Sequence, residues 1–480
     1  MTVASSRFLR KGGKAARSRR SRGSSMRNPA AWAALDRWVA AAFLGFCFLL
    51  GGTSQNLPML YLSIELVSLV AIGFAIWRLT PQGWARARPF VIAALLLVSL
   101  PALQLIPLPA GLWEALPAHN FYAAALREIG VADAWRPATL SPDRTLRSLL
   151  FLLPVLAAGL LFAPLDKPGH LLLLDVLLVC LGASALLAVS QIAVQGPYFY
   201  SVTNRGSGVG FFSNRNHQAL FVAIGIILIM ARWRIAEIAD RRVETGVIAA
   251  SALVLFLPFL LIIGSRSGLL TGVLAFAAGG AVFLRRALIR QSALKRWAIL
   301  AGVFVITAAA LVLALLSSRI NALDRLFNSD GSDLRAVNLP AVLDALWSFF
   351  PLGAGFGTFD PVFRRFEPYE SLSPAYFNHA HNDLVEIVLE GGVFALALLG
   401  AILVLLARKA PILWIAASRY SGRILAKAGY LGLLLLGIGS AVDYPLRTPF
   451  LAVLAMLLAI WCFAATEGDD VGLGRTSRIG

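Results

Sequence analysis

Long apolar stretches recur along the chain from near residue 38 to near residue 466, and polar segments of unequal length separate them. A helix needs about 20 mostly apolar residues to cross the hydrocarbon core of a bilayer, and many of these stretches approach that length. The pattern therefore predicts an all-α fold, a polytopic transmembrane helix bundle with about twelve spans. The predicted spans are 38–53, 56–77, 90–106, 147–164, 170–192, 218–232, 246–264, 268–284, 297–316, 383–406, 428–442 and 448–466.

The composition agrees with a membrane protein. Hydrophobic residues make up 58% of the chain and charged residues 14%, whereas soluble domains carry about a quarter charged residues. The mean hydropathy is +0.76. The formal net charge of +18 raises the alternative of nucleic-acid binding, but charged termini and loops of a membrane protein explain it better, so we expect no nucleic-acid partner. Cys47, Cys180 and Cys462 lie in apolar runs, where a thiol usually behaves as a small buried hydrophobe.

Basic residues set the expected domain organisation. The first 27 residues hold nine Lys or Arg and no acidic residue, which predicts a disordered cytoplasmic tail over 1–30. A cleaved signal peptide is not expected, because many more spans follow the first and it shows no small-residue cleavage pattern. Residues 31–466 form the predicted membrane domain, and 467–480 a second cytoplasmic tail. With the amino terminus inside, most of the 43 basic residues fall in inward loops, such as RLTPQGWARAR and RWRIAEIADRR.

Three long segments then face outward. They cover about 107–146, 193–217 and 317–382, and the aromatic and apolar residues of the first and third predict short helices on the membrane face. Loops this long in a compact protein are usually functional or disordered. Arg335 and Arg447 are among the arginines expected on this face, so any chemistry is expected there.

Polar residues cluster where the third outward segment meets a span, in FNHAHNDLVEIVLEGG. On a helix, residues three, four and seven apart share one face, so Asn382, Asp383, Glu386 and Glu390 form a polar stripe. Carboxylates at membrane depth normally mark a cavity, a proton relay or a charged partner. The alternative is that Glu386 and Glu390 lock helices together, and His379 and His381 have the corresponding alternative of capping at the membrane interface.

Two further segments carry arginine toward the outward face. The loop NRGSGVGFFSNRNHQ holds Arg205, Asn214, Arg215 and Asn216, and its glycines let backbone amides approach a ligand. Arginine provides a planar fork suited to phosphate. Arg266, in the short GSRSG turn between two apolar spans, also implies an anionic partner.

Motifs in this order along the chain resemble the O-antigen ligase and polysaccharide polymerase family of bacterial inner-membrane glycosyltransferases. The segments that carry the resemblance are LQLIPLPAGLWEALP, the loop from Arg205 to Asn216, SRSG at 265–268, PLGAGFGTF at 351–359, AHNDLVEIVLEGG at 380–392 and DYPLRTP at 443–449. One departure is Ala395, which stands where the ligase pattern has a second glycine after Gly392.

The resemblance implies a reaction and its partners. A glycan moves from undecaprenyl diphosphate to a sugar hydroxyl on the periplasmic face, without nucleotide sugar and, for the ligases, without a required metal or other cofactor. The acceptor is lipid A-core for a ligase or a second lipid-linked glycan for a polymerase, and membrane lipids surround the enzyme. The sequence leaves these two activities open.

The resemblance also implies roles for residues of this chain. Arg266, with Arg205 or Arg215, would clamp the departing diphosphate, and His381 would remove the acceptor proton or orient the diphosphate. The other expected substrate-binding residues are Asn214, Asn216, His379, Asn382, Glu386 and Arg447.

A transporter or flippase of lipid-linked sugars is the alternative from another class. Glu65 and Asp175 lie inside predicted spans and favour it, although a helix-packing hydrogen bond would also explain each of them. The chain shows no repeat between its halves, which transporters of this kind commonly have.

Overall fold

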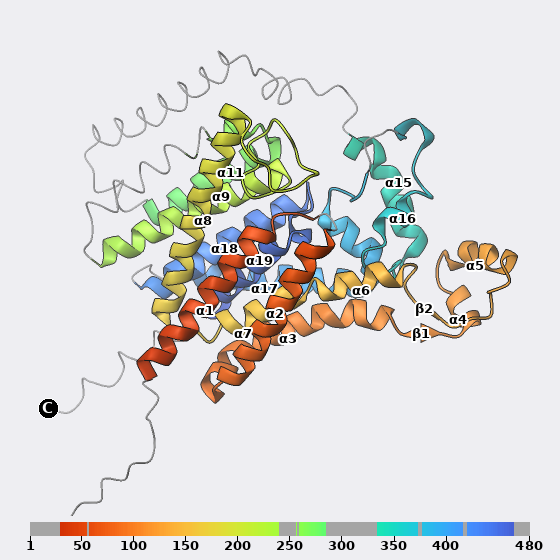
Figure 1. Ribbon diagram of the computed structural model, residues 1–480, viewed down its shortest axis with the longest axis horizontal. Helices are drawn as coiled ribbons and strands as arrows, with labels where there is room; N and C mark the ends of the chain where they lie inside the picture. Colours follow the sequence, from red (N-terminus) through yellow and green to blue (C-terminus); the bar gives the residue numbers. More distant parts are fainter. Residues whose placement is uncertain are drawn as a thin grey trace, which may run out of the picture.

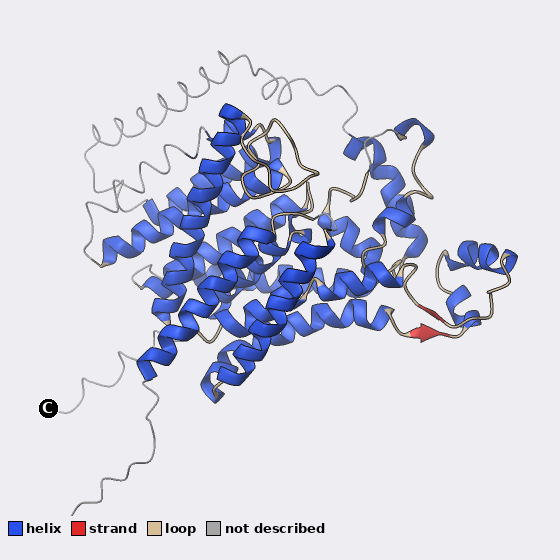
Figure 2. Ribbon diagram, viewed as in Figure 1, coloured by secondary structure: helices blue, strands red, loops and turns tan. Residues whose placement is uncertain are grey.

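A computed structural model gives the fold. It describes residues 29–54, 57–239, 256, 259–284, 334–372, 377–415 and 420–464. Within these ranges the chain is helical apart from loops and one ribbon of two short strands (Figures 1 and 2). The all-α prediction is confirmed for this part of the chain. The predicted span 297–316, most of 246–264 and nearly all of both predicted tails lie outside it.

The first half of the chain forms helices that begin at proline or polar caps. Thr80 caps α3 by accepting a hydrogen bond from the Gly83 amide, and Asp166 caps α8 in the same way through Gly169. Proline occupies an early helical position in several of them, where its missing N–H costs nothing. The helices are α1 (Pro29–Leu50), α2 (Pro58–Arg78), α3 (Pro81–Gln104), α4 (Ala110–Glu114), α5 (His119–Glu128), α6 (Pro142–Leu150), α7 (Leu153–Phe162) and α8 (Lys167–Val194).

The second half follows the same plan. Its helices are α9 (Arg215–Ile238), α11 (Arg266–Gly279) with a π-helical end η1 (Gly280–Leu284), α15 (Leu334–Phe349), α16 (Phe359–Phe363), α17 (Asp383–Ile415), α18 (Ser421–Ser440) and α19 (Pro449–Ala464), with 3₁₀ turns η2 (Tyr369–Ser371) and η3 (Pro445–Arg447).

The described residues contain nine helical stretches long and apolar enough to cross a membrane, with α6 and α7 counted together as Pro142–Phe162 and α11 with η1 as Arg266–Leu284. This confirms a multi-pass membrane protein, with fewer spans in the described residues than the twelve predicted. The ninth begins at Ser421, and α19 is an apolar helix of 16 residues, shorter than a usual span. The exposed side chains of α2 are mostly apolar, Met59, Leu66 and Val70 among them, as expected for a helix that faces lipid.

Helix α9 is more buried than the other candidate spans of the described residues, and it packs against α8, α11 and α18 (Figure 1). Small residues allow these helices to approach closely: a side chain at Gly225 would collide with Leu181 of α8, and one at Gly429 with the Leu458 carbonyl of α19. Asp175 of α8 pairs with Arg232 of α9, with 2.6 Å between Oδ1 and Nε. The helix-packing explanation of Asp175 is therefore the one that the structure supports.

The three cysteines are buried, as predicted.

The long connections lie at one end of the bundle, which we call the loop end. They are the described parts of the segments 107–146, 193–217 and 317–382. There, β1 (Pro107–Leu108) pairs antiparallel with β2 (Arg136–Pro137), and together they hold α4 and α5 away from the bundle (Figure 1). Helices α15 and α16 share a second apolar core with Phe377, against which Tyr122 of α5 packs. The short helices expected in the first and third long segments are therefore present.

A kink in α17 fixes its first two turns. Gly392 has a φ of 60°, and a side chain there would lie 2.1 Å from the Pro351 carbonyl oxygen. The amides of Ala354 and Gly355 donate to the carbonyls of Leu389 and Glu390, so the PLGAG segment packs along this part of α17. The glycines of both motifs thus serve a close backbone contact that holds the polar start of α17 in place.

Candidate functional site

The segment 377–382 delivers His381 to the loop end just before α17 begins. His381 has a φ of 50°, a left-handed conformation that is uncommon for a residue with a side chain. Backbone amides on both sides hold it there: the Ala380 amide donates to Oε2 of Glu386, and the Asp383 amide donates to the backbone carbonyl of Asp443. Such strained residues are frequent at functional sites.

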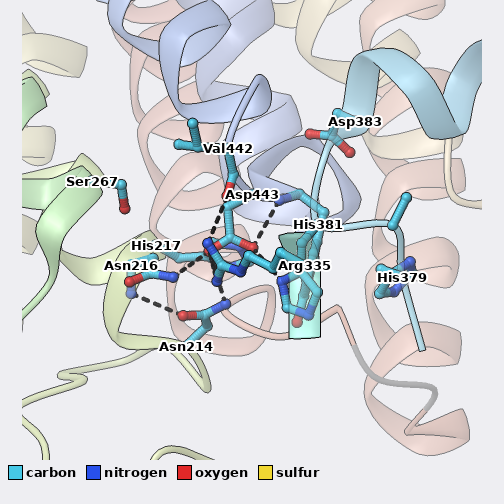
Figure 3. A network of polar contacts seen from close by, with 12 residues as sticks. Asn214, Asn216, His217, Ser267, Arg335, His379, His381, Asp383, Val442 and Asp443 are labelled. Atoms are coloured by element: carbon cyan, nitrogen blue, oxygen red, sulfur yellow. Dashed lines mark hydrogen bonds and ion pairs between the residues drawn. The ribbon is translucent and has the colours of Figure 1, made fainter. Parts of the chain in front are cut away.

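Asp443 is the centre of a polar network at this point (Figure 3). Its Oδ1 lies 3.3 Å from Nδ1 of His381, and its Oδ2 accepts hydrogen bonds from Asn214 and Asn216. Nη2 of Arg335 lies 3.8 Å from the same oxygen, while Nη1 donates to the Val442 carbonyl at 2.8 Å. A carboxylate with 3% exposure therefore connects its own segment with three others that are distant in sequence.

These partners keep Asp443 ionised. Burial would raise the pKa of this carboxyl group, but the hydrogen bond with His381 and the electrostatic effects of His217 and Arg335 bring the pKa well below its usual range. The negative charge in turn favours the His381 tautomer that carries hydrogen on Nδ1. Nε2 of His381 is then left as the nitrogen that can accept a proton.

The amino ends of three helices converge on the network. Asn214 caps α9 through the Asn216 amide, Ser265 caps α11 through the Gly268 amide, and Asn382 caps α17 through the Leu384 and Val385 amides. Oγ of Ser265 also donates to Oδ1 of Asn216 at 2.8 Å. The amino end of a helix attracts anions.

The first residues of two of these helices are arginines. Arg215 begins α9 and Arg266 begins α11. The hydrogen bonds from Ser265 to Asn216, from Asn216 to Asp443, and between Asp443 and His381 connect the SRSG turn to the AHND segment. A chain of hydrogen-bonded side chains thus links the start of α11 to His381. Arg205, by contrast, is exposed in the loop before α9.

Arg447 has a different environment from the other predicted arginines. Its Nη2 lies 2.7 Å from Glu390 and 3.3 Å from Glu386, and its Nε lies 3.6 Å from Asp383. All three carboxylates are fully buried. Burial would lower the pKa of Arg447, but Glu390, Glu386 and Asp383 raise it above its usual value. Its charge is thus engaged by α17, and the packing explanation of Glu386 and Glu390 fits this geometry.

His379 connects this carboxylate cluster to the network of Asp443. Its Nδ1 lies 2.8 Å from Oε1 of Glu386. The rings of His379 and His381 lie with their centroids 4.4 and 4.9 Å from that of Tyr444. Burial raises the pKa of Tyr444, so this phenol stays neutral and acts as an aromatic spacer between the two imidazoles.

Sequence reasoning overlooked three site residues. Arg335 is expected on the outward face, but the sequence assigns neither it nor Asp443 and Tyr444 to the site, because no spacing along the chain connects them with His381. DYPLRTP did contain the first two, and it was the signal available. Within the described residues, no group of three or more His, Cys, Asp or Glu side chains is arranged to hold a metal ion.

A large cavity opens beside the site. Its volume is about 2600 Å³, its walls are mostly apolar, and helices α2, α3, α6, α17, α18 and α19 contribute to it. His379, Glu386, Glu390 and Arg447 lie on its wall, next to the loop end. A long-chain lipid would find both an apolar space and polar groups here.

Residues 251–400 match the protein family described as O-antigen ligase. This range includes the SRSG turn, the PLGAGFGTF segment and the start of α17, whereas Asn216 and Asp443 contact it from outside. No curated protein matches the chain. The match supports the family that the motifs resemble, and this family implies a membrane enzyme that transfers glycans.

Proposed function

We propose that this protein is a glycosyltransferase that moves a glycan from undecaprenyl diphosphate to a sugar hydroxyl, as an O-antigen ligase acting on lipid A-core. The observation that carries the proposal is the His381–Asp443 pair, held where arginine-bearing amino ends of α9 and α11 meet. A base and an anion-binding region are then adjacent, as transfer from a lipid diphosphate requires.

His381 acts as the base. Asp443 holds the Nδ1–H side of the ring, and Nε2 takes the proton of the acceptor hydroxyl as its oxygen attacks the anomeric carbon of the donor sugar. The new glycosidic C–O bond forms while the bond from that carbon to the diphosphate breaks, and the diphosphate leaves on its lipid with the bonding electrons. Proton transfer of this kind typically contributes about 10²–10⁴-fold to the rate.

Arg266, with Arg215 or Arg205, stabilises the diphosphate as its negative charge grows. The amino ends of α9 and α11 add the partial positive charge of their unpaired N–H groups. Asn214 and Asn216 are held by Asp443, so they position these helix ends as well as offering amide groups to substrate. Losing one donor to such a developing charge typically costs about 10²–10³ in rate.

The site faces the periplasm of a bacterial inner membrane in this proposal, and both termini lie in the cytoplasm. Basic residues support the orientation, because they gather at helix ends opposite the loop end. These residues are Arg86 and Arg88 at the start of α3, Arg232 and Arg234 near the end of α9, Arg408 and Lys409 late in α17, and Arg423 and Lys427 at the start of α18. Positively charged ends prefer the cytoplasmic side.

A polymerase is the second candidate, since it differs only in its acceptor. Ala395 in place of glycine favours it over the ligase pattern. Ala395 is buried, and a side chain at Gly391 would lie 2.7 Å from its Cβ. This position therefore packs against the kinked part of α17, and in sequence it is separate from His381. The difference therefore bears on helix packing more than on the base.

Purified full-length protein with a preformed lipid-linked donor tests the proposal. We expect glycosidic product with lipid A-core as the acceptor. Arg266→Ala should lower the yield about 10²–10³-fold. Arg127→Ala is the matched control, because this loop-end arginine pairs with Glu114 in the α4–α5 hairpin and should leave the yield unchanged.

Each other outcome points to a different activity. Product only when a second lipid-linked glycan is the acceptor would establish the polymerase. No product with either acceptor, combined with movement of the donor across a vesicle membrane, would favour the transporter.

A further inference from the structure

The large cavity contains polar groups that a plain hydrocarbon chain does not need. Arg144 and Arg147 lie on its wall near the loop end, and Glu65 lies on its wall within α2. These residues belong to neither the Asp443 network nor the Arg447 cluster. Their positions therefore say something separate about what the cavity holds.

Arg144 and Arg147 have donors available for an anion. Asp360, which is nearly buried, pairs with both Arg144 and Arg364, so it neutralises only part of the positive charge there. The exposed Arg147 side chain makes no hydrogen bond or close ion pair with another described residue, and it interacts electrostatically with Asp143, one turn earlier on the same wall. Two arginines one helical turn apart at the rim of an apolar cavity suit a phosphate group.

Glu65 is a carboxyl group inside the apolar cavity. It is partly buried and has no hydrogen bond or ion pair to another described residue. The hydroxyl of Tyr61, one turn away, donates to the Thr53 carbonyl. A carboxyl group at membrane depth is costly unless a partner satisfies it, so Glu65 calls for a ligand that donates a hydrogen bond.

Glu65 and the two arginines lie at different depths along the cavity wall. The Phe151 amide bonds the Arg147 carbonyl, so the two residues are one turn apart. The ring of Phe151 lies 6.5 Å from that of Tyr61, and Glu65 follows Tyr61 by another turn. Helices α6 and α2 both run away from the loop end here, and each step of one turn covers about 6 Å. Glu65 therefore lies roughly 12 Å deeper than Arg147 along the wall.

We propose that this cavity binds a phosphate-bearing acyl lipid, with the phosphate at Arg144 and Arg147 and a hydroxyl or amide N–H of its chain region at Glu65. A glycolipid with amide-linked hydroxyacyl chains on a phosphorylated sugar has this chemistry. The inference rests on the proposed function, for which it identifies the cavity as the site of the acceptor lipid. A polyprenyl chain has no donor and would leave Glu65 unsatisfied.

Direct binding to the full-length protein in detergent tests this without any transfer step. The probes are a bis-phosphorylated lipid A, its dephosphorylated form, undecaprenyl phosphate and phosphatidylethanolamine. Lipid A affinity should fall about tenfold in Arg147→Gln and about tenfold in Glu65→Leu, while Glu65→Gln, which still accepts a hydrogen bond, loses less. Glu128→Gln, exposed at the loop end outside the cavity, is the control.

The other probes decide between the occupants. Dephosphorylated lipid A should bind weakly and show no dependence on Arg147, and undecaprenyl phosphate affinity should not fall in Glu65→Leu. The proposal is overturned if Glu65→Leu leaves lipid A affinity unchanged, if undecaprenyl phosphate depends on Glu65 as lipid A does, or if phosphatidylethanolamine competes equally. Because the assay measures binding alone, a failure of transfer would not imitate any of these results.

Discussion

The structure contains two histidine–carboxylate pairs two residues apart in sequence, and their surroundings differ. His381 pairs with Asp443 beside two asparagines, two arginine-bearing helix ends and Arg335. His379 pairs with Glu386, which belongs to the buried cluster around Arg447. In the first pair the carboxylate orients a ring whose Nε2 can accept a proton, whereas in the second pair the carboxylate is shared with Arg447 inside a buried cluster. A polar stripe alone does not identify a site, because the same residue types serve both purposes.

The largest expected effect separates the two histidines. His381→Ala should lower glycan transfer about 10²–10⁴-fold, because the base is lost. His379→Ala should lower transfer less than about tenfold, because His379 supports Glu386 and is not the base. Product formation at equal amounts of folded protein measures both. Equal losses in the two variants would remove the distinction.

The arginines give the next largest contrast. Arg447→Leu should destabilise the protein by about 3–5 kcal/mol, because it leaves three buried carboxylates without their cation. Arg335→Leu should cost about 1 kcal/mol or less, since this side chain is partly exposed and lies 3.8 Å from Asp443. Thermal unfolding in one detergent compares them. A stable Arg447→Leu variant would contradict the compensating role of Arg447.

Asp443→Asn tests how the base is held. The amide has nearly the same shape but no longer favours hydrogen on Nδ1 of His381, so transfer should fall about 10–100-fold. The pH dependence of transfer should change as well, which a purely structural role would not produce. Unchanged activity with an unchanged pH profile would show that His381 needs no carboxylate partner.

The smallest effect concerns acid stability. The pKa of Asp443 is lower in the folded protein than in the unfolded chain, so its stabilising contribution is complete above the unfolded pKa and is lost as the pH falls toward the folded pKa. As the pH is lowered from about 5, the melting temperature of the native protein should therefore fall more steeply than that of Asp443→Asn. Parallel curves would indicate that the network does not hold Asp443 ionised.

The sequence supported part of the candidate site. The stripe of Asn382, Glu386 and Glu390 and the turn at Arg266 were found from helical spacing and from charge beside apolar spans. Arg447 also stood out, but spacing gave no indication that it pairs with three residues of α17. Asp443 and Arg335 were not assigned to the site, since their contacts join segments that are 62 or more residues apart.

The sequence by itself determined that this protein is a helical membrane bundle with polar residues gathered at one end. The length of an apolar stretch and the placement of charges beside it are local properties, and they decide whether a segment crosses a bilayer and in which direction. Only the tertiary structure decided which of those polar residues face one another. The close approach of glycine-bearing backbones at Gly392 and the convergence of α9, α11 and α17 bring Asp443 to His381 and Arg447 to the carboxylates. Such contacts depend on packing across the whole bundle, so no short-range pattern encodes them.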